Sequence, residues 1–361
     1  MCIGNLANVL LLQKKLDEAE ELTRRALEIS SRAKDGNPMS EPFLLNRLSG
    51  ILEARGQLEE AERVGRQALA KHRGLFGDNH PMVPNIVINL AAILAKQGKD
   101  AETEKLYQEF LPGLPEVHER SARLLETRGA FFARRARWQV AAADFSRVIE
   151  LRPAGLTAWH SLAALVLQKG NLDAYREHCR SSLKQFGKST DANTVLTIAK
   201  DCLILTPTAA DLGIIAALLE NSPAAEASDA FGLPASTRAL AAYRQGHVAE
   251  AVDTSQRALR SSATDSTRKE NPGPPIQAQI QAVLAMARWQ LKESDLARAA
   301  LAEVINFANT KMPKIGSGDL GEDWAEWIIV QTLLREAREL IEETTPNAVA
   351  PGTPVPQPKS K

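Results

Sequence analysis

Apolar side chains recur every three to four residues through the first 110 positions, and this pattern repeats at a fixed distance. Three stretches of 25 residues align without gaps; they begin at Asn5, Arg47 and Asn89, so each starts 42 residues after the one before. In each stretch the apolar positions lie on one face of a helix, a turn follows, and a second helical pattern begins. The pattern predicts three helix hairpins over residues 1–115.

The turns and the small residues of these stretches agree with that prediction. Gly56 and Gly98 mark two of the turns, and Lys14 stands at the same position of the first stretch. Small side chains such as Ser49 and Ala91 let the two helices of a pair approach closely. A hairpin of this kind has one apolar face that it cannot bury alone, so neighbouring hairpins must stack.

The period then shortens to 34 residues and predicts two more hairpins over residues 119–190. Apolar residues at helical spacing flank a turn at residue 136, and the same arrangement recurs around a turn at Gly170, 34 residues later. The positions that carry the pattern are Gly129, Phe132, Ala141, Phe145, Pro153, Trp159, Leu162 and Gly170. We interpret these residues as structural, because they recur at the spacing that buries one helix against the next.

Two further hairpins are expected over residues 232–310, one around Gly246 with Ala251 and Ala258, the other around Lys292. The stretch between them, residues 261–275, is rich in Pro, Gly and Ser and predicts a flexible loop.

The segments around these hairpins give weaker or different patterns. Residues 191–222 supply two apolar helical stretches without the repeated positions, so we expect a degenerate helix pair. Residues 319–343 predict one amphipathic helix that caps the last hairpin. Residues 344–361 contain five prolines and no aromatic residue, and are expected to be disordered.

Both periods resemble the tetratricopeptide repeat (TPR). The first block is similar to the 42-residue form found in kinesin light chains and their bacterial relatives, in which "GDNHP", here residues 77–81, commonly precedes a first helix. The resemblance implies an all-α fold: a TPR solenoid, that is, an α-α superhelix of stacked helix hairpins with a C-terminal capping helix. It also makes His80 part of a connector rather than a metal ligand or a catalytic base.

The resemblance further implies a concave face, lined by the first helix of each hairpin, that binds an extended protein or peptide ligand. In kinesin-light-chain-like repeats asparagines clamp the ligand backbone at the position of Asn5, Arg47 and Asn89, and an amide suits this role because it both donates and accepts. Neighbouring candidates on this face are Asn46, Asn85, Lys96, Arg123, Glu126, Arg134 and His160. A solvated helix face is the alternative for all of them.

A second resemblance begins at about residue 119. The segments "RRARWQVAAADFSRVIELRP" and "DLGEDWAEWIIVQTLLREARELI" look like the TPR region at the C-terminal end of large bacterial serine/threonine protein kinases. Two function classes follow. The chain is a non-catalytic scaffold for protein or peptide binding, or it is the regulatory, substrate-recruiting region of such a kinase, whose catalytic domain is absent from these residues.

Two segments match nucleotide-binding motifs in their letters but lack the structural context that such motifs need. "SLKQFGKST" (182–190) lacks the first glycine of a phosphate-binding loop and follows a helix, and "GSGDLG" (316–321) has no strand before it. The three cysteines are widely spaced and the six histidines show no paired ligand spacing. The sequence therefore predicts no catalytic residue, no metal and no cofactor.

Charge and hydropathy bear on partners and location. Lys+Arg and Asp+Glu both total 44, so no global field attracts nucleic acid or membrane. The widely spaced cysteines and the lack of a signal peptide favour a cytoplasmic protein.

The chain enters a helical pattern at once, without a capping residue, so we expect the natural unit to continue upstream. Exposed terminal hairpins also leave self-association open as a third interpretation.

Overall fold

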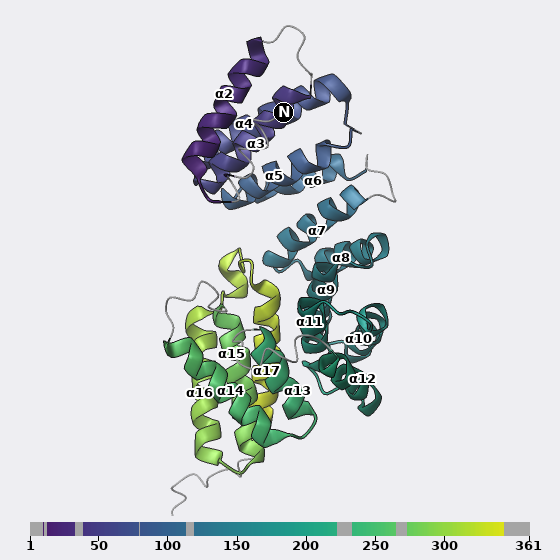
Figure 1. The fold of residues 1–361 in the computed structure, drawn as a ribbon, viewed down its shortest axis with the longest axis vertical. Helices are drawn as coiled ribbons and strands as arrows, with labels where there is room; N and C mark the ends of the chain where they lie inside the picture. The colour runs from purple at the N-terminus through teal and green to yellow at the C-terminus, as the bar shows by residue number, and fades with distance from the viewer. Residues whose placement is uncertain are drawn as a thin grey trace, which may run out of the picture. The chain divides into compact units, whose positions relative to one another are not determined.

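The computed structural model describes residues 10, 13–32, 39–78, 80–112, 119–221, 233–264 and 273–342. Within these ranges the regular structure is helical, with no strand, and successive helices pair as antiparallel hairpins (Figure 1). The chain divides into two compact units. Unit 1 comprises residues 1–133 and 137–158, and unit 2 comprises residues 134–136 and 159–361.

Unit 1 contains the 42-residue block and the hairpin that follows it. Its helices are α2 (Leu16–Arg32), α3 (Ser40–Ala54), α4 (Leu58–Phe76), α5 (Val83–Lys96), α6 (Asp100–Phe110), α7 (Glu119–Arg134) and α8 (Trp138–Leu151). The first helices of its hairpins include α3, α5 and α7, and the second helices are α2, α4, α6 and α8.

Unit 2 holds the remaining hairpins and a last single helix. Its helices are α9 (Leu156–Lys169), which begins at the boundary between the units, α10 (Leu172–Phe186), α11 (Ala192–Leu203), α12 (Ala209–Glu220), α13 (Leu233–Arg244), α14 (Val248–Thr264), α15 (Pro274–Gln290), α16 (Ser294–Lys311) and α17 (Trp324–Ile341). Helices α11 and α12 form a pair where the sequence predicts a degenerate one. Helix α14 reaches Thr264 and α15 starts at Pro274, so the connection between them is shorter than the loop expected over 261–275.

The hairpin turns share one backbone conformation. A residue with positive φ, between 57° and 80°, stands at the equivalent position of seven turns: Lys14, Gly56, Gly98, Ala136, Gly170, Gly246 and Lys292. Glycine adopts this left-handed conformation freely, whereas a residue with a Cβ atom is strained in it. Three hairpins keep the turn geometry without glycine, with Lys14, Ala136 and Lys292 at the left-handed position.

Small residues on the second helices set the distance between helices. Ala19, Ala61 and Thr103 stand 42 residues apart, and each is completely buried. Ala141 and Ala251 are buried in the same way in the later repeats. Their size allows the close helix approach that the sequence predicted for each hairpin.

Aromatic residues fill the core of the 34-residue hairpins. Phe132 and Phe145 are buried, and a Cβ atom added to Gly129 would lie 3.2 Å from the ring of Phe145. Trp159 is buried against Phe186, with ring centroids 5.8 Å apart. Among the other repeat positions, Ala258 is buried, Leu162 is half-buried, and Pro153 is exposed.

Ion pairs join the second helices of unit 1 in a fixed register. Arg24 of α2 pairs with Glu60 of α4, and both Arg66 and Arg73 of α4 pair with glutamates of α6, Glu102 and Glu109, each time 36 residues ahead. These pairs are exposed, and such pairs contribute about 0–1 kcal/mol each. These ion pairs therefore show that the second helices follow one register, but they add little to the stability of the unit.

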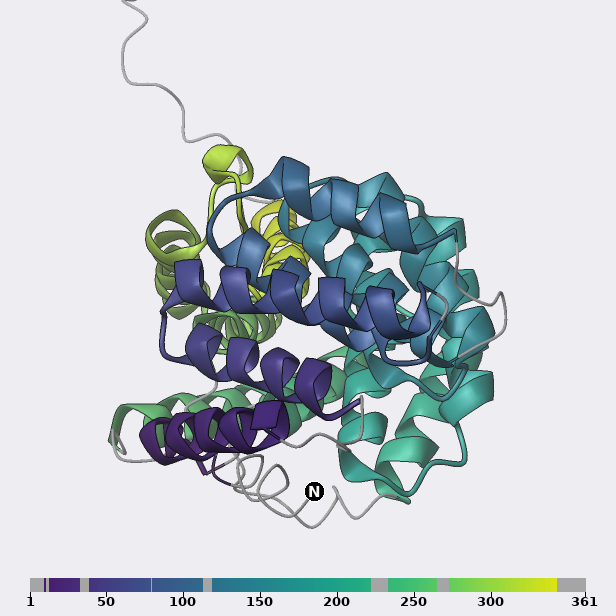
Figure 2. The same cartoon turned by 90° about the horizontal axis from the view of Figure 1, so that it is seen from above.

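Helix α17 packs along α15 and α16, as a cap on the last hairpin would, and it extends further. Its side chains also pair with residues of α9, α11 and α13, the first helices of three other hairpins. In Figure 2 the yellow α17 accordingly lies among the green and teal helices of the same unit. The helix thus covers the face that these first helices share.

Candidate binding faces

Four polar residues on successive first helices of unit 1 form what we call the unit 1 amide face: Asn46 on α3, Asn85 and Asn89 on α5, and Arg123 on α7. The Nδ2 atom of Asn89 donates to Oδ1 of Asn46 at 3.1 Å. The Nη1 atom of Arg123 donates to Oδ1 of Asn85 at 3.3 Å. The structure therefore brings four of the predicted residues together in a row across three helices.

Charged pairs border this row. Lys96 pairs with Glu53 of α3, and Glu126 of α7 accepts from Arg152 at 2.7 Å. The Lys96 side chain is half exposed, whereas Glu126 is mostly covered. Both predicted residues thus lie in unit 1 beside the amide row, and each already has a partner within the chain.

Arg47 differs from the two asparagines with which it aligns. Its guanidinium lies 4.7 Å from the ring centre of Phe43, and its Nη1 atom is enclosed without a hydrogen-bond partner in the described part of the chain. Burial lowers the pKa of Arg47. Asn5, the first of the aligned positions, lies outside the described residues.

Unit 2 contains a buried charge cluster, formed by His160 (α9), Lys200 and Asp201 (α11) and Glu326 (α17). Lys200 is 1% exposed, and its Nζ atom donates to Glu326 Oε1 at 2.5 Å. His160 Nδ1 lies 3.0 Å from Asp201, and its Nε2 lies 3.5 Å from Glu326. Gln279 of α15 donates to the second oxygen of Glu326 at 2.6 Å.

The pKa values in this cluster follow from its geometry. Burial alone would raise the pKa of Glu326, but Lys200, His160 and the hydrogen bond from Gln279 lower it to about 2. Burial would likewise lower the pKa of His160, but Asp201 and Glu326, one beside each ring nitrogen, raise it despite the opposing charge of Lys200. These contacts therefore favour the protonated form of His160 and the ionised form of Glu326, because a buried charge is costly unless it faces an opposite one.

Two further ion pairs hold the C-terminal segment. Arg244 of α13, whose side chain is 3% exposed, binds both carboxylate oxygens of Glu336 on α17. Arg134 binds both carboxylate oxygens of Asp319, at 2.9 and 2.6 Å. The backbone N–H of Leu320 also donates to the carbonyl of Arg134.

These contacts correct two expectations. Arg134 and His160 were assigned to an open binding face, but the chain's own residues 319–336 occupy both of them. Their partners lie 185 and 166 positions further along the chain, so no repeat period relates them. Sequence reasoning also missed Lys200, Asp201, Arg244, Glu326 and Glu336. One signal was present: Lys200 and Asp201 interrupt the apolar run "TIAKDCLIL".

The formal motifs lie on a helix and in connections between helices. The ring of His80 packs on His72 and Phe76, with centroids 4.6 and 4.9 Å apart, in the connector before α5. Residues 182–186 belong to α10, and residues 316–321 form the connection to α17. Across the described ranges, no three His, Cys, Asp or Glu side chains gather as metal ligands.

Profile comparisons decide the family. Three family profiles, each described as tetratricopeptide repeat, match residues 40–116, residues 1–33, and residues 132–190 with 236–311. Together these segments cover more than half of the chain. The chain belongs to the tetratricopeptide repeat family. The matches take in both the 42-residue and the 34-residue block, and TPR proteins in general serve as scaffolds for protein–protein interaction.

Solved structures that resemble this TPR chain are distant. BtubC (BKLC) from P. vanneervenii is 19% identical, with a TM-score of 0.45, over 52% of this chain and 82% of that one. A tetratricopeptide repeat protein from Parabacteroides merdae is 15% identical, with a TM-score of 0.43, over 93% and 97%. A putative kinesin light chain from Podosopora anserina is 18% identical, with a TM-score of 0.44, over 52% and 95%. None of the curated proteins matches.

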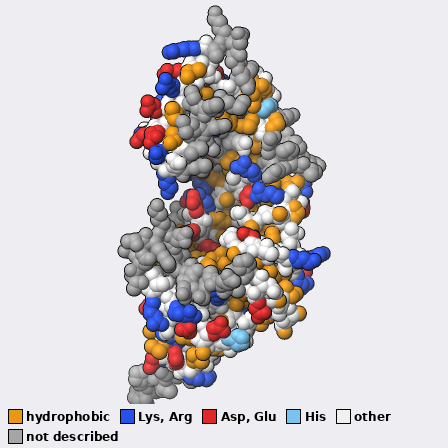
Figure 3. All heavy atoms as spheres, in the orientation of Figure 1, with side chains coloured by type: hydrophobic (Ala, Val, Ile, Leu, Met, Phe, Trp, Pro, Cys, Tyr) orange, Lys and Arg blue, Asp and Glu red, His pale blue; other side chains and the backbone are white. Residues whose placement is uncertain are grey.

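Two general properties of the surface bear on partners. Lys and Arg side chains are interspersed with Asp and Glu on the face shown in Figure 3, in keeping with the formal net charge of zero. Of the helices in the described ranges, none combines the length and the apolar character needed to cross a bilayer.

Proposed function

We propose that this TPR protein binds an extended peptide segment of a partner protein through the unit 1 amide face. One observation carries the proposal: the bonds Asn46–Asn89 and Asn85–Arg123 link the amide groups of α3 and α5, and the guanidinium of α7, in a row across three successive first helices. Amide side chains pair with one another here, and each can exchange that bond for a peptide N–H or C=O.

The dimensions suit such a ligand. Packed helices lie about 8–10 Å apart, so a row across three of them extends about 20 Å. An extended peptide advances about 3.3 Å per residue, so about six residues would cross the face. The positive charges of Lys96 and Arg123 are balanced by the negative charges of Glu53 and Glu126, so these four residues together carry no net charge. Backbone recognition would therefore dominate over charge.

The test is selection from a displayed library of random heptapeptides with the purified full chain as bait. The Asn46→Ala, Asn89→Ala double variant should capture the selected peptides at least tenfold more weakly, at unchanged helicity by circular dichroism. The matched control is Asn193→Ala, Asn306→Ala, which removes two asparagine side chains from unit 2. Equal capture by all three proteins would contradict the proposal.

A second candidate is the regulatory region of a serine/threonine protein kinase. The order of the segments between residues 119 and 343 favours it. Sequencing the genomic DNA upstream of the first codon tests it directly. An in-frame glycine-rich loop followed by an HRD motif would support this function, and a stop codon just upstream would contradict it.

A further inference from the structure

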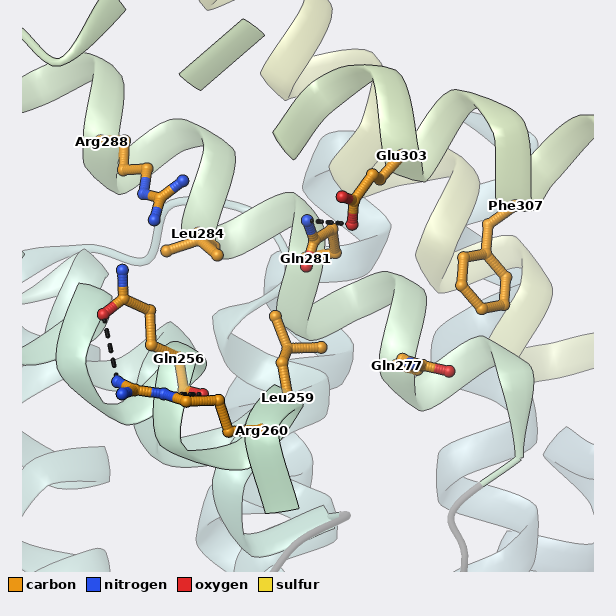
Figure 4. A pocket seen from close by; sticks show the side chains of 9 residues that line it. All are labelled: Gln256, Leu259, Arg260, Gln277, Gln281, Leu284, Arg288, Glu303 and Phe307. Atoms are coloured by element: carbon orange, nitrogen blue, oxygen red, sulfur yellow. Dashed lines mark hydrogen bonds between the residues drawn. The ribbon is translucent and has the colours of Figure 1, made fainter. Parts of the chain in front are cut away.

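A pocket of about 530 Å³ lies between α14, α15 and α16 in unit 2 (Figure 4). Its floor is one stripe of α15 that carries Gln277, Gln281, Leu284 and Arg288, at spacings of three and four residues. Gln279 lies off this stripe and reaches α17 instead. The pocket is thus separate from the contacts that hold α17, and it lies in a different unit from the amide face.

The floor is polar although it is deeply covered. Gln281 is 7% exposed, and its Nε2 atom donates to Glu303 Oε2 of α16 at 2.8 Å. This bond fixes the orientation of the amide in the pocket. A buried amide is costly unless its hydrogen bonds are made, and an apolar residue would pack there at less cost. The polar floor therefore points to a polar occupant.

Arg288 supplies a second indication. Its Nη1 atom donates to the carbonyl of Leu296 at 3.4 Å, which anchors the guanidinium to α16. Its Nε atom is enclosed and has no hydrogen-bond partner among the described residues, and the carboxylate of Glu293 is 3.9 Å away. A covered cationic donor without an acceptor is rare, because its lost hydration is not replaced.

The pocket is divided into a basic part and an apolar part. In the view of Figure 4 the guanidinium groups of Arg288 and Arg260 lie on the same side, with the amide of Gln256 between them. Leu259 from α14 and Phe307 from α16 line the other part, where Glu303, the one carboxylate among the described lining residues, accepts the hydrogen bond from Gln281. An anionic group therefore fits at one end and an apolar side chain at the other.

We infer that this pocket binds a short acidic peptide segment of a partner protein, with an Asp or Glu carboxylate at Arg288 and Arg260 and an apolar side chain against Leu259 and Phe307. Carboxylates form strong charge-assisted bonds with guanidinium groups. From Gln277 to Arg288 the floor extends about 16 Å at 1.5 Å per residue, which is the length of about five extended residues. The glutamine amides would pair with the peptide backbone.

The test uses an arrayed library of pentapeptides that are acetylated and amidated, so that carboxylates come from Asp and Glu alone. The probe is the full chain carrying a fluorescent label. Acidic peptides with a Leu or Phe should be enriched among the bound members, and Arg288→Gln should weaken their binding about tenfold, as expected for loss of a charged hydrogen bond.

The matched control is Arg298→Gln, which neutralises an arginine of α16 that does not line the pocket. It should bind the acidic peptides as the wild type does, and so should the Asn46→Ala, Asn89→Ala variant of unit 1. If Arg288→Gln lowers helicity, Arg260→Gln on the exposed wall replaces it, with a smaller expected loss. Bound peptides without acidic enrichment, or equal losses in the Arg288 and Arg298 variants, would overturn the inference.

Discussion

The first helices of units 1 and 2 are built from the same repeat, yet their shared faces are used differently. In unit 1, Asn46, Asn85 and Asn89 lie half-buried and bond to neighbouring side chains of the same face. In unit 2 the corresponding face carries Lys200 and Arg244, and α17 covers both of them. The same helix face therefore pairs with its own neighbours in one unit and with a later helix of the chain in the other.

The difference teaches that polar residues on the face of a TPR helix do not by themselves define a binding site. His160 and Asn89 are both polar positions on first helices, but His160 contacts Glu326 of α17, whereas Asn89 bonds to Asn46 of a neighbouring first helix. What decides is whether a later segment of the chain supplies complementary charges. Glu326 and Glu336, ten residues apart on α17, supply them in unit 2.

The largest expected effect comes from breaking the core of unit 2. Lys200→Met should lower the free energy of unfolding of unit 2 by about 3–5 kcal/mol, because Glu326 loses its buried cationic partner. Trp324 and Trp327 are buried in α17, so tryptophan fluorescence during urea unfolding reports this loss when Trp138, the tryptophan of unit 1, is replaced by phenylalanine in all proteins compared. An unchanged midpoint would mean that α17 does not depend on the cluster.

Unit 1 offers a matched variant. Asp144 is 2% exposed and binds Arg128 through both carboxylate oxygens. Asp144→Asn should destabilise unit 1 by a similar amount, while the fluorescence change from α17 keeps its wild-type midpoint. If both variants shift both transitions equally, the two units unfold together, and the comparison between them concerns surfaces rather than stability.

A smaller effect should come from pH. The raised pKa of His160 contributes stability that is fully present below the ordinary value of 6.5 and is lost as pH rises through the folded value. The lowered pKa of Glu326 contributes stability above 4.5 that is lost as pH falls toward 2. Docking of α17 should therefore be strongest between about pH 4.5 and 6.5.

The measurement is the melting temperature by tryptophan fluorescence from pH 4 to 9, for the wild type and for His160→Gln. The difference between the two proteins should be largest in the acidic window and should shrink as pH rises. A difference that is independent of pH would assign His160 a packing role only.

Substitutions at the hairpin turns should change the free energy of unfolding of each unit by about 1 kcal/mol. Gly98→Ala should destabilise unit 1 by about that amount, because φ of +73° strains a residue with a Cβ atom. Lys292→Gly should have the opposite sign in unit 2, a gain of about 0.5 kcal/mol, since Lys292 already bears that strain. Chemical denaturation measures both. A loss in the lysine variant would show that its side chain, and not its backbone, matters at the turn.

The smallest expected effect belongs to the outer ion pairs of unit 1. Arg66→Gln removes the bond to Glu102 and the bond to Glu62 within α4, and should cost about 0.5 kcal/mol or less, because the Arg66 side chain is exposed. The change should vanish in 1 M salt, which screens exposed charges. A loss as large as that expected for Asp144→Asn would mean that these pairs support unit 1 as a network.

Local patterns predicted the hairpins, because each turn and each small residue acts within one repeat. Gly56, Gly98 and Ala61 recur at a fixed spacing, so their roles could be read from the chain. The pairing of Lys200 with Glu326 joins residues 126 positions apart, and no local pattern predicts it. The pairing of His160 with α17, and that of Arg134 with Asp319 just before α17, depends on such long-range contacts. The pocket floor on α15 was missed for a related reason, since Gln281 and Arg288 occupy ordinary polar positions of a helix.

The position of α17 also has a consequence for synthesis. Each hairpin of unit 1 needs only its neighbours, so it can fold as it leaves the ribosome. Unit 2 needs Glu326 and Glu336, which are made after α9, α11, α13 and α15. Until then, Lys200 and Arg244 have no partner on α17, and the apolar surface around them is uncovered. During translation, chaperones and nascent neighbours would therefore meet this face before the finished protein hides it.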